Sequence, residues 1–229
     1  VVPSFQRPYS WKKERWQTFL EGVLDVCHEE KIHEIFLGAI AIMPVDPTPS
    51  GLRKYLLVDG QQRLITMLAL LAALRNCARD AGLEIADQIT HQCLINPEEE
   101  WNYRYKLLPK DTNRKVFFRT LEGDDPDEGE HLFAASAFFM EEIRHTHRGV
   151  NYHRLHELLL DHFMIVRIEL DKDENPYPIF KSLNMGDDPE PAIGLEEYHR
   201  FASDPQIMAL IAAGESQQVE FKEAVSIHT

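Results

Sequence analysis

The sequence predicts a mixed α/β fold of the α+β kind, in which a small sheet carries helices and a mostly helical lobe follows. Two short apolar runs, Phe36–Met43 and Lys54–Asp59, are bounded by polar turn residues and have the length of buried strands. Directly after the second run, apolar residues change to helical spacing and continue without glycine or proline as far as Gly82. A later apolar run rich in β-branched residues, Phe163–Leu170, supplies a third strand.

In the first half, helices are expected before and after the two strands. Ser10 is a typical N-cap residue, and the apolar residues after it recur at helical spacing, which predicts an amphipathic helix over residues 11–30. A loop of about ten residues with three prolines then joins the strands. Strand, tight turn and long helix follow each other over residues 54–80.

In the second half, the same periodicity predicts helices at about residues 112–121, 130–147 and 151–161. The acidic sequence Gly123–Gly129 separates the first two of these helices and is typical of an exposed loop. The strand Phe163–Leu170 follows the last helix, and we expect it to return to the first sheet.

Composition limits the classes of protein to which this chain can belong. The chain has 229 residues and a formal net charge of −14, from 24 Lys and Arg against 38 Asp and Glu. Residues 1–120 carry 16 basic and 15 acidic side chains, whereas residues 121–229 carry 8 and 23, so a polyanion would bind the first half. The three cysteines form no disulfide or metal pattern, and no stretch resembles a signal peptide or a membrane span. We therefore expect a cytoplasmic protein with no membrane partner.

The segment LLVDGQQRLITM contains the best candidate for a functional site. Its strand end, turn and first helical turn place free backbone N–H groups, two side-chain amides and a guanidinium at one corner. Such a corner binds phosphate, because unpaired N–H donors and the helix dipole converge there and an arginine adds a bidentate contact. The residues concerned are Asp59, Gly60, Gln61, Gln62 and Arg63. Asp59 would anchor the turn or hold a phosphate-bound Mg²⁺.

A purely structural interpretation of this corner stays open. Asp59 would then cap the helix and pair with Arg63 at i, i+4, which is a common arrangement. The two interpretations are compatible, because a salt-bridged arginine can also face a ligand. The sequence G-x-x-x-x-G-K-[ST] is missing, which excludes a P-loop as the route to phosphate binding.

The opening segment Val2–Trp11 is the second candidate. It places Gln6, Arg7 and Tyr9 among prolines that stiffen the chain before the first helix. Rigid aromatic rings beside an arginine suit stacking on a base and contact with a phosphate. The structural alternative is an N-terminal strand whose aromatic residues complete the core.

Three motifs in this order resemble the N-terminal domain of GmrSD-type, modification-dependent restriction proteins. They are FQRPYSW, FLGAIAI and VDGQQRLITM, within about residues 2–80. The later IFKSLNMG, Ile179–Gly186, is similar to that family's Phe-x-x-x-Asn-x-x-Gly segment, although Met185 and Gly186 follow the asparagine directly. The resemblance covers about residues 1–186. It implies a ParB/sulfiredoxin-like fold whose strand–turn–helix carries an arginine at a nucleotide phosphate.

The resemblance implies that the Asp59–Arg63 corner binds and hydrolyses an NTP with Mg²⁺. Asp59, Gln61 and Arg63 would be catalytic: Asp59 would hold metal or water, Gln61 or Gln62 would orient the attacking water, and Arg63 would neutralise phosphate charge. Gly60 and Gln62 would belong to the nucleotide-binding set.

The second wall of the implied site is the opening segment. Gln6 and Arg7 would contact the nucleotide from there, with Arg7 as a second cation and Tyr9 as a stacking ring. In the family, nucleotide turnover is coupled to cleavage of foreign or modified DNA by a separate nuclease domain or subunit, and we find no nuclease motif in this chain. The oligomeric state, including a homo-oligomer, stays open.

The domain organisation that follows has three parts. Residues 1–122 form the ParB/sulfiredoxin-like nucleotide-binding domain, and residues 123–200 form the helical lobe with one returning strand. Residues 201–229 resemble the start of a Schlafen-type AlbA-like domain, too short to bury a core of its own. Because the family's usual continuation after the asparagine segment differs here, we expect a stretch near residues 186–188 to be missing from the sequence.

Three functions are therefore compared. The first is an NTP-hydrolysing sensor domain of a restriction or antiphage defence protein. The second is a non-hydrolysing, nucleotide-switched module that binds DNA. The third is a scaffold in which both motifs are structural, for which NTP and Mg²⁺ would leave the melting temperature unchanged.

Overall fold

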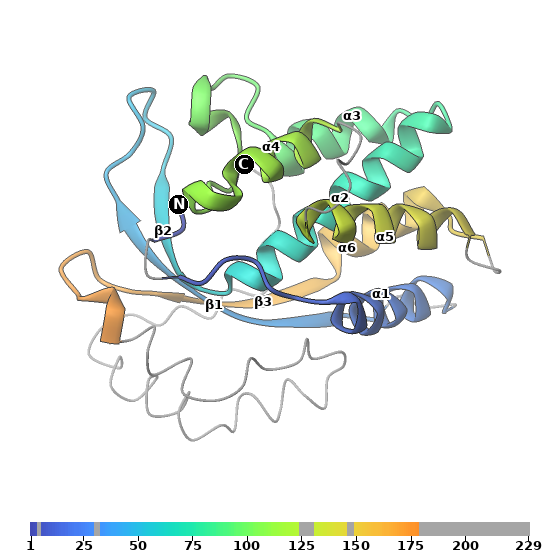
Figure 1. Cartoon of the computed structure of the whole chain (residues 1–229), viewed down its shortest axis with the longest axis horizontal. Coiled ribbons are helices and arrows are strands. Elements are labelled where there is room, and N and C mark those ends of the chain that lie inside the picture. The colour runs from blue at the N-terminus through green and yellow to red at the C-terminus, as the bar shows by residue number, and fades with distance from the viewer. Residues whose placement is uncertain (4–5, 30–32, 124–130, 146–148, 179–229) are drawn as a thin grey trace.

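The computed structural model describes residues 1–3, 6–29, 33–123, 131–145 and 149–178 (Figure 1). Within this part of the chain the fold is the mixed α+β class that the sequence predicts. The helices are α1 (Lys13–His28), α2 (Gln61–Asp80), α3 (Ile85–Ile89), the π-helix η1 (Thr90–Leu94), the 3₁₀-helix η2 (Trp101–Arg104), α4 (Asp111–Glu122), α5 (His131–His145) and α6 (Tyr152–Asp161). The strands are β1 (Ile35–Val45), β2 (Lys54–Asp59) and β3 (Phe163–Glu169).

These strands form one mixed sheet in the order β2-β1-β3. β1 pairs antiparallel with β2 and parallel with β3. The expectation that the last strand returns to the first sheet is therefore confirmed. A parallel pair needs a long crossover, and here the chain from α2 to α6 supplies it (Figure 1).

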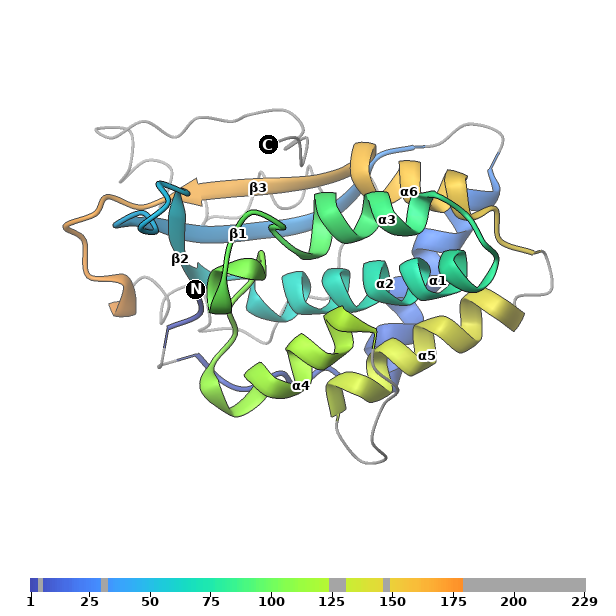
Figure 2. The same cartoon turned by 90° about the horizontal axis from the view of Figure 1, so that it is seen from above.

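α2 is the central helix of the molecule. Fifteen of its 20 residues are buried, so it is covered on nearly all sides rather than along one stripe. Viewed from above, it runs between α3 on one side and the α4–α5 pair on the other (Figure 2). Alanines 69, 72, 73 and 78 keep its surface narrow enough for neighbouring helices to pack closely.

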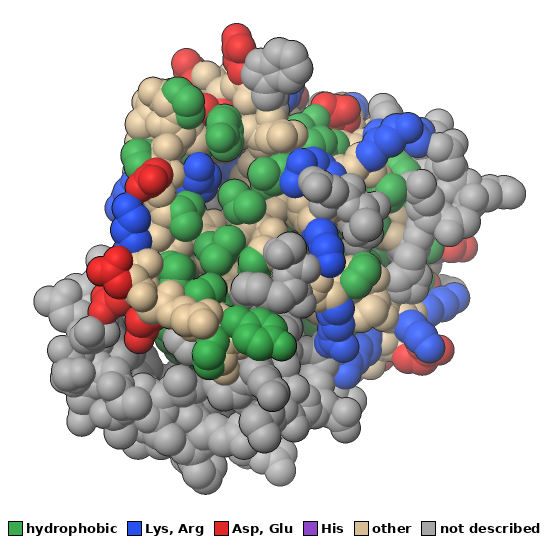
Figure 3. Space-filling view, turned by 60° about the vertical axis from the view of Figure 1, so that its left-hand side comes forward, with side chains coloured by type: hydrophobic (Ala, Val, Ile, Leu, Met, Phe, Trp, Pro, Cys, Tyr) green, Lys and Arg blue, Asp and Glu red, His purple; other side chains and the backbone are tan. Residues whose placement is uncertain are grey.

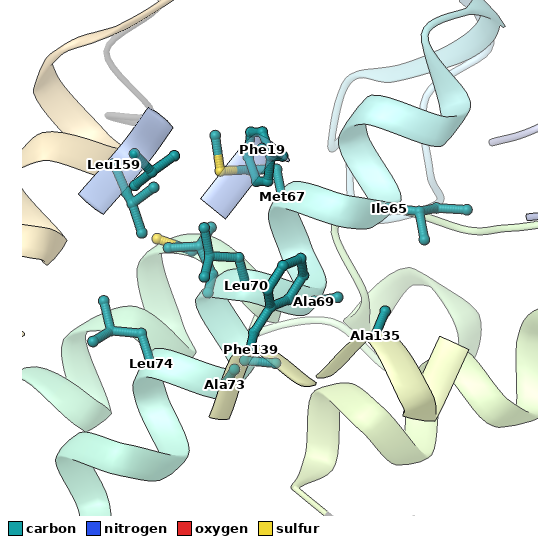
Figure 4. Packing of buried hydrophobic residues seen from close by; sticks show 14 of the residues in the cluster. Phe19, Ile65, Met67, Ala69, Leu70, Ala73, Leu74, Ala135, Phe139 and Leu159 are labelled. Atoms are coloured by element: carbon teal, nitrogen blue, oxygen red, sulfur yellow. The ribbon is translucent and has the colours of Figure 1, made fainter. Parts of the chain in front are cut away.

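The hydrophobic core surrounds α2 and draws on both halves of the chain. Phe19 of α1, Leu70 of α2, Phe139 of α5 and Leu159 of α6 point toward one another (Figure 4). The Phe19 and Phe139 rings meet edge to face with centroids 6.4 Å apart, a favourable aromatic geometry. Helices from the expected ranges 1–122 and 123–200 thus share one core.

Two local predictions at the start of the chain need correction. Ser10 is not an N-cap residue, because α1 begins at Lys13 and its N-cap is Lys12. The backbone N–H of Ser10 instead donates to the Gln62 side chain. β1 also extends past Met43 to Val45, because beyond Ile42 it pairs only with β2 and no partner on its other edge needs the N–H that Pro44 lacks.

The opening residues lie along the edge of β2 that does not pair with β1. The Leu57 N–H donates to the Val1 carbonyl at 2.8 Å, and the Val2 N–H donates to the Leu108 carbonyl at 2.9 Å. Trp11 is buried, as the structural alternative expects, but the described residues of this segment do not form the strand of that alternative. No helix in the described ranges is both long and apolar enough to cross a membrane.

Candidate functional site

The candidate site begins at the turn between β2 and α2. Asp59 ends β2, Gly60 follows with φ = +92°, and α2 starts at Gln61. This φ lies in the left-handed region, which favours glycine. A Cβ on Gly60 would lie 2.5 Å from the Cγ2 atom of Ile40, so the close packing of the turn on β1 also requires glycine. The positive φ and the close contact with Ile40 both explain why glycine follows Asp59.

Arg63 reaches back from α2 to β1. Its Nη1 atom donates to the Ala39 carbonyl at 2.5 Å and lies 3.5 Å from Asp59 Oδ2. The side chain is only 9% exposed, and Asp59 is 19% exposed. The i, i+4 ion pair of the structural interpretation is thus present, but Asp59 does not cap α2, since the N-cap is Gly60 and no side chain caps this end.

An irregularity of β1 makes room for this arginine. Phe36 pairs with Met164 and Gly38 with Ile165, so Leu37 is an extra residue in the register of β1 against β3. Gly38 has φ = +97°, and a Cβ there would lie 3.3 Å from Arg63 Nε. Sequence reasoning assigned no role to Gly38, although an isolated glycine inside a strand pattern indicates a bulge or a close approach.

The two glutamines at the start of α2 differ in their surroundings. The Gln62 amide accepts from the Ser10 N–H at 2.8 Å and donates to the Pro8 carbonyl at 3.1 Å. Gln61 is buried, with only 1% of its surface exposed, yet neither its Oε1 nor its Nε2 has a hydrogen-bond partner in the described part of the chain. Gln62 therefore has a structural role, and Gln61 keeps its whole hydrogen-bonding capacity.

The opening segment forms a wall held by its own polar residues. Gln6 donates to the carbonyls of Leu57 at 3.2 Å and Val58 at 2.7 Å, which attaches the segment to β2. The Tyr9 hydroxyl bonds to Thr66 on α2 at 2.8 Å, and burial raises the pKa of this phenol far above its usual range.

Arg7 is exposed on the same wall, next to Gln6. The structure therefore brings the opening segment to the start of α2, as expected for the two sides of one site. The side chains of Gln6, Tyr9 and Gln62 bond within the protein, and their contact with a nucleotide stays a prediction.

The expected magnesium ligand is Asp59. Among the residues that the structure describes, no group of three or more His, Cys, Asp or Glu could hold a metal ion. A protein site for Mg²⁺ commonly supplies only one or two carboxylates and leaves the other positions to water and substrate phosphates. Asp59, partly exposed beside the turn, fits that limited donor set. IFKSLNMG and the AlbA-like segment lie outside the described residues.

A separate hollow of about 200 Å³ lies between the β1–β2 hairpin and the chain after η1. Its lining includes Tyr55, Tyr103 and Tyr105 together with Arg53, Lys54 and Lys106. No acidic residue is among the described residues that line it. Burial lowers the pKa of Lys106 from its ordinary value, although Cys93 opposes the shift. Figure 3 shows a face of the molecule where hydrophobic side chains gather with Lys and Arg side chains near them.

Fold and site together define a mixed α+β domain with a buried strand–turn–helix corner that presents an arginine, a carboxylate and an unsatisfied amide. Residues 1–189 match the family model described as the GmrSD restriction endonuclease, N-terminal domain. Because the match covers most of the chain, this protein belongs to that family. The comparison with curated proteins returns no match to this chain.

Proposed function

We propose that this chain is an NTP-binding and NTP-hydrolysing sensor domain of a modification-dependent restriction or antiphage defence protein. Nucleotide turnover would be coupled to DNA cleavage by another domain or subunit. The observation that carries the proposal is Gln61, whose amide is buried without a partner at the start of α2. Membership of a restriction endonuclease family supplies the link to DNA.

An unsatisfied buried amide is costly. A buried polar group without a hydrogen bond lowers the stability of the folded protein by about 1–3 kcal/mol, and native structures contain few such groups. At Gln61 both amide atoms are in this state. A polyphosphate and its associated water would supply an acceptor for Nε2 and a donor for Oε1. The same corner has the free N–H groups of a helix start, which favour an anion.

The neighbouring residues support a phosphate-binding role. Both of the hydrogen bonds that the structure gives Arg63 use Nη1, so Nε and Nη2 keep N–H groups for a phosphate. Arg7, exposed on the facing wall, would be the second cation. Gln6 and Gln62 would act indirectly, because they hold that wall against β2 and α2.

In this proposal catalysis is mainly positioning and charge stabilisation, as in phosphoryl transfer generally. Gln61 would orient the attacking water through its amide. Arg63 would neutralise charge on the phosphates, and its contact with the Ala39 carbonyl would fix the direction of its guanidinium. Asp59 would hold Mg²⁺, which when bound neutralises charge on the β- and γ-phosphates.

The test compares the two adjacent glutamines. Gln61→Met removes an amide that makes no bond in the protein, so the variant should fold with an unchanged or higher melting temperature. Its rate of phosphate release from NTP and Mg²⁺ should fall about 10²-fold, as expected when one positioned polar group is lost. Gln62→Met is the matched control: it should lower the melting temperature, because two internal hydrogen bonds are lost.

Four results separate the alternatives. Undiminished phosphate release by well-folded Gln61→Met would remove the catalytic assignment of Gln61, and release that persists in Arg63→Ala would do the same for Arg63. Tight NTP binding without release would favour a nucleotide switch. No change of melting temperature on adding NTP and Mg²⁺ would favour the scaffold, because ligands that bind the native state raise its stability.

The second candidate, a non-hydrolysing, nucleotide-switched module that binds DNA, is favoured by the hollow beside the β1–β2 hairpin. Its cations and tyrosines suit contact with a nucleic acid backbone and bases. If this function is correct, Arg53→Met would weaken DNA binding and reduce its dependence on salt concentration, whereas phosphate release would be absent in the wild type as well.

A further inference from the structure

Arg75, near the far end of α2, is a buried cation with little compensation. Only 1% of its surface is exposed. Its Nε donates to Asn76 Oδ1 at 2.7 Å, and its buried Nη2 atom has no hydrogen-bond partner among the residues that the structure describes. Among the described residues no ion pair is formed by Arg75. A guanidinium carries five N–H donors, so most of its capacity is unused here.

This arrangement is unfavourable unless an anion is nearby. Removing a guanidinium from water costs several kcal/mol, and buried charges in proteins are normally paired. Burial, and then the charge of Arg79, lower the pKa of Arg75 to about 10, so the side chain is still charged at pH 7. Loss of its proton therefore does not relieve Arg75 of the free-energy cost of a buried charge.

A second arginine lies at the same place. Arg79 is one helical turn after Arg75 and is exposed. Gly123, the C-cap of α4, marks the point where the two meet: a Cβ there would lie 3.1 Å from Arg75 Nη2 and 3.3 Å from Arg79 Nη1. The two guanidinium groups thus lie against the same glycine, and the Asn76 Oδ1 atom lies 3.1 Å from the same Cβ position, so a side chain here would crowd all three groups.

Among the described residues, the acidic side chains of Glu122 and Asp80 near the pair are bound to other partners. Glu122 accepts a hydrogen bond from the Tyr105 hydroxyl, and Asp80 pairs with Arg144. The C-terminal carbonyls of α4 would attract cations, but the structure shows no hydrogen bond to them from either arginine. Local structural explanations within the described residues therefore leave the pair uncompensated.

We infer that Arg75 and Arg79 form a binding site for a phosphate group, entered beside Gly123. The planar fork of a guanidinium matches the oxygens of a phosphate, and two such forks can bind one group from two sides. The site is separate from the Asp59–Arg63 corner, since Arg75 lies 12 residues after Arg63 along α2, about 18 Å at 1.5 Å per residue. The phosphate could belong to a small metabolite or to the DNA backbone.

The first experiment measures the melting temperature of the whole chain as inorganic phosphate is added. The wild type should be stabilised, since phosphate would bind the native state. Arg79→Met, an exposed substitution, should bind phosphate about tenfold more weakly, which corresponds to 1.4 kcal/mol. Lys115→Met, which removes an exposed cation of α4, is the matched control and should keep the full response. Equal stabilisation of all three proteins by phosphate would overturn the inference.

Arg75→Met gives an independent readout. In phosphate-free buffer its melting temperature should be unchanged or higher, because an uncompensated buried charge is replaced by an apolar side chain. Phosphate should then have no effect on it. A lower melting temperature in phosphate-free buffer would show that the charge is compensated within the chain and would contradict the inference.

A DNA arm distinguishes the two sources of phosphate. Loss of affinity for a DNA duplex in Arg79→Met, with no response of the wild type to inorganic phosphate, would assign the site to the DNA backbone. A response to inorganic phosphate without any effect on DNA binding would assign it to a small ligand. No response to either would refute the site. Gln61→Met should keep the phosphate response, so failure here and failure of the proposed NTP site are separable.

Discussion

At the scale of single residues, the sequence indicates where the Asp59–Arg63 corner lies but not which role each of its residues has. The strand end, the glycine turn and the polar first helical turn follow from residue types alone. The different roles of Gln61 and Gln62 do not, because the partners of Gln62 are backbone groups of Pro8 and Ser10, far away in the sequence. The position of Arg63 likewise depends on the bulge at Gly38.

Gly60 is required by both its backbone and its contact. Gly60→Ala should destabilise the protein by more than the ~1–3 kcal/mol of a left-handed non-glycine residue, since the new Cβ would also collide with Ile40. Gly82→Ala is the matched control, because Gly82 also has a positive φ but no atom within 4 Å of the added Cβ. Urea unfolding would check both; equal losses would show that the contact with Ile40 is unimportant.

His156 should make stability depend on pH. Burial, helped by His153 and opposed by Asp161, lowers the pKa of His156 below 6.5, and its Nε2 has no partner. The unfolded chain then binds the proton more tightly, so stability is present above pH 6.5 and is lost as the pH falls toward the lower pKa of the folded state.

His156→Gln should therefore lose less stability than the wild type between about pH 7.5 and pH 5.5, as measured by urea midpoints, with both limits about one unit from the ordinary pKa of histidine. His91→Gln, at an exposed position, is the comparison and should behave as the wild type. A steeper loss in His156→Gln would contradict the direction of the pKa shift.

At the scale of elements, long periodic segments were predictable and short ones were not. The helices around residues 61–80 and 152–161 and all strands of the described sheet were located from periodicity and length. Periodicity does not indicate α3, η1 or η2, each only four or five residues long. Segments of this length show too few repeats for a period, and α3 and η1 pack against α2, a contact that periodicity does not reveal.

The start of α6 offers a test of capping. Asn151 is its N-cap, and the side chain accepts a hydrogen bond from the Arg154 N–H at 3.1 Å. Asn151→Ala should lower the free energy of unfolding by about 1 kcal/mol. Lys12→Ala is the control, since Lys12 is the N-cap of α1 and makes no capping bond. Thermal unfolding would show the difference, and equal effects would argue against the cap.

At the scale of the whole molecule, the described parts of residues 1–122 and 123–200 share one hydrophobic core. The acidic sequence after residue 122 was predicted as an exposed loop, which is a surface feature, whereas the core is assembled from contacts between distant segments. The sequence cannot show such contacts directly, because periodicity reports which face of an element is apolar but not which element covers it.

Phe139→Ala tests this shared core. Its side chain, fully buried against Phe19, should contribute about 3–5 kcal/mol to stability. We expect a single calorimetric transition in the wild type, and in the variant the whole transition should move to lower temperature. Two transitions, with only one of them moved, would instead support two independently folding units.

The position of β1 between an early and a late strand has a consequence for how the protein is made. β1 obtains its antiparallel neighbour soon after it leaves the ribosome, but its parallel neighbour only after the whole crossover has been synthesised. Until then one row of its N–H and C=O groups is open to pairing with other chains. A fragment ending near residue 122 would keep that open edge permanently and should aggregate, so expression of this family member requires the chain through β3.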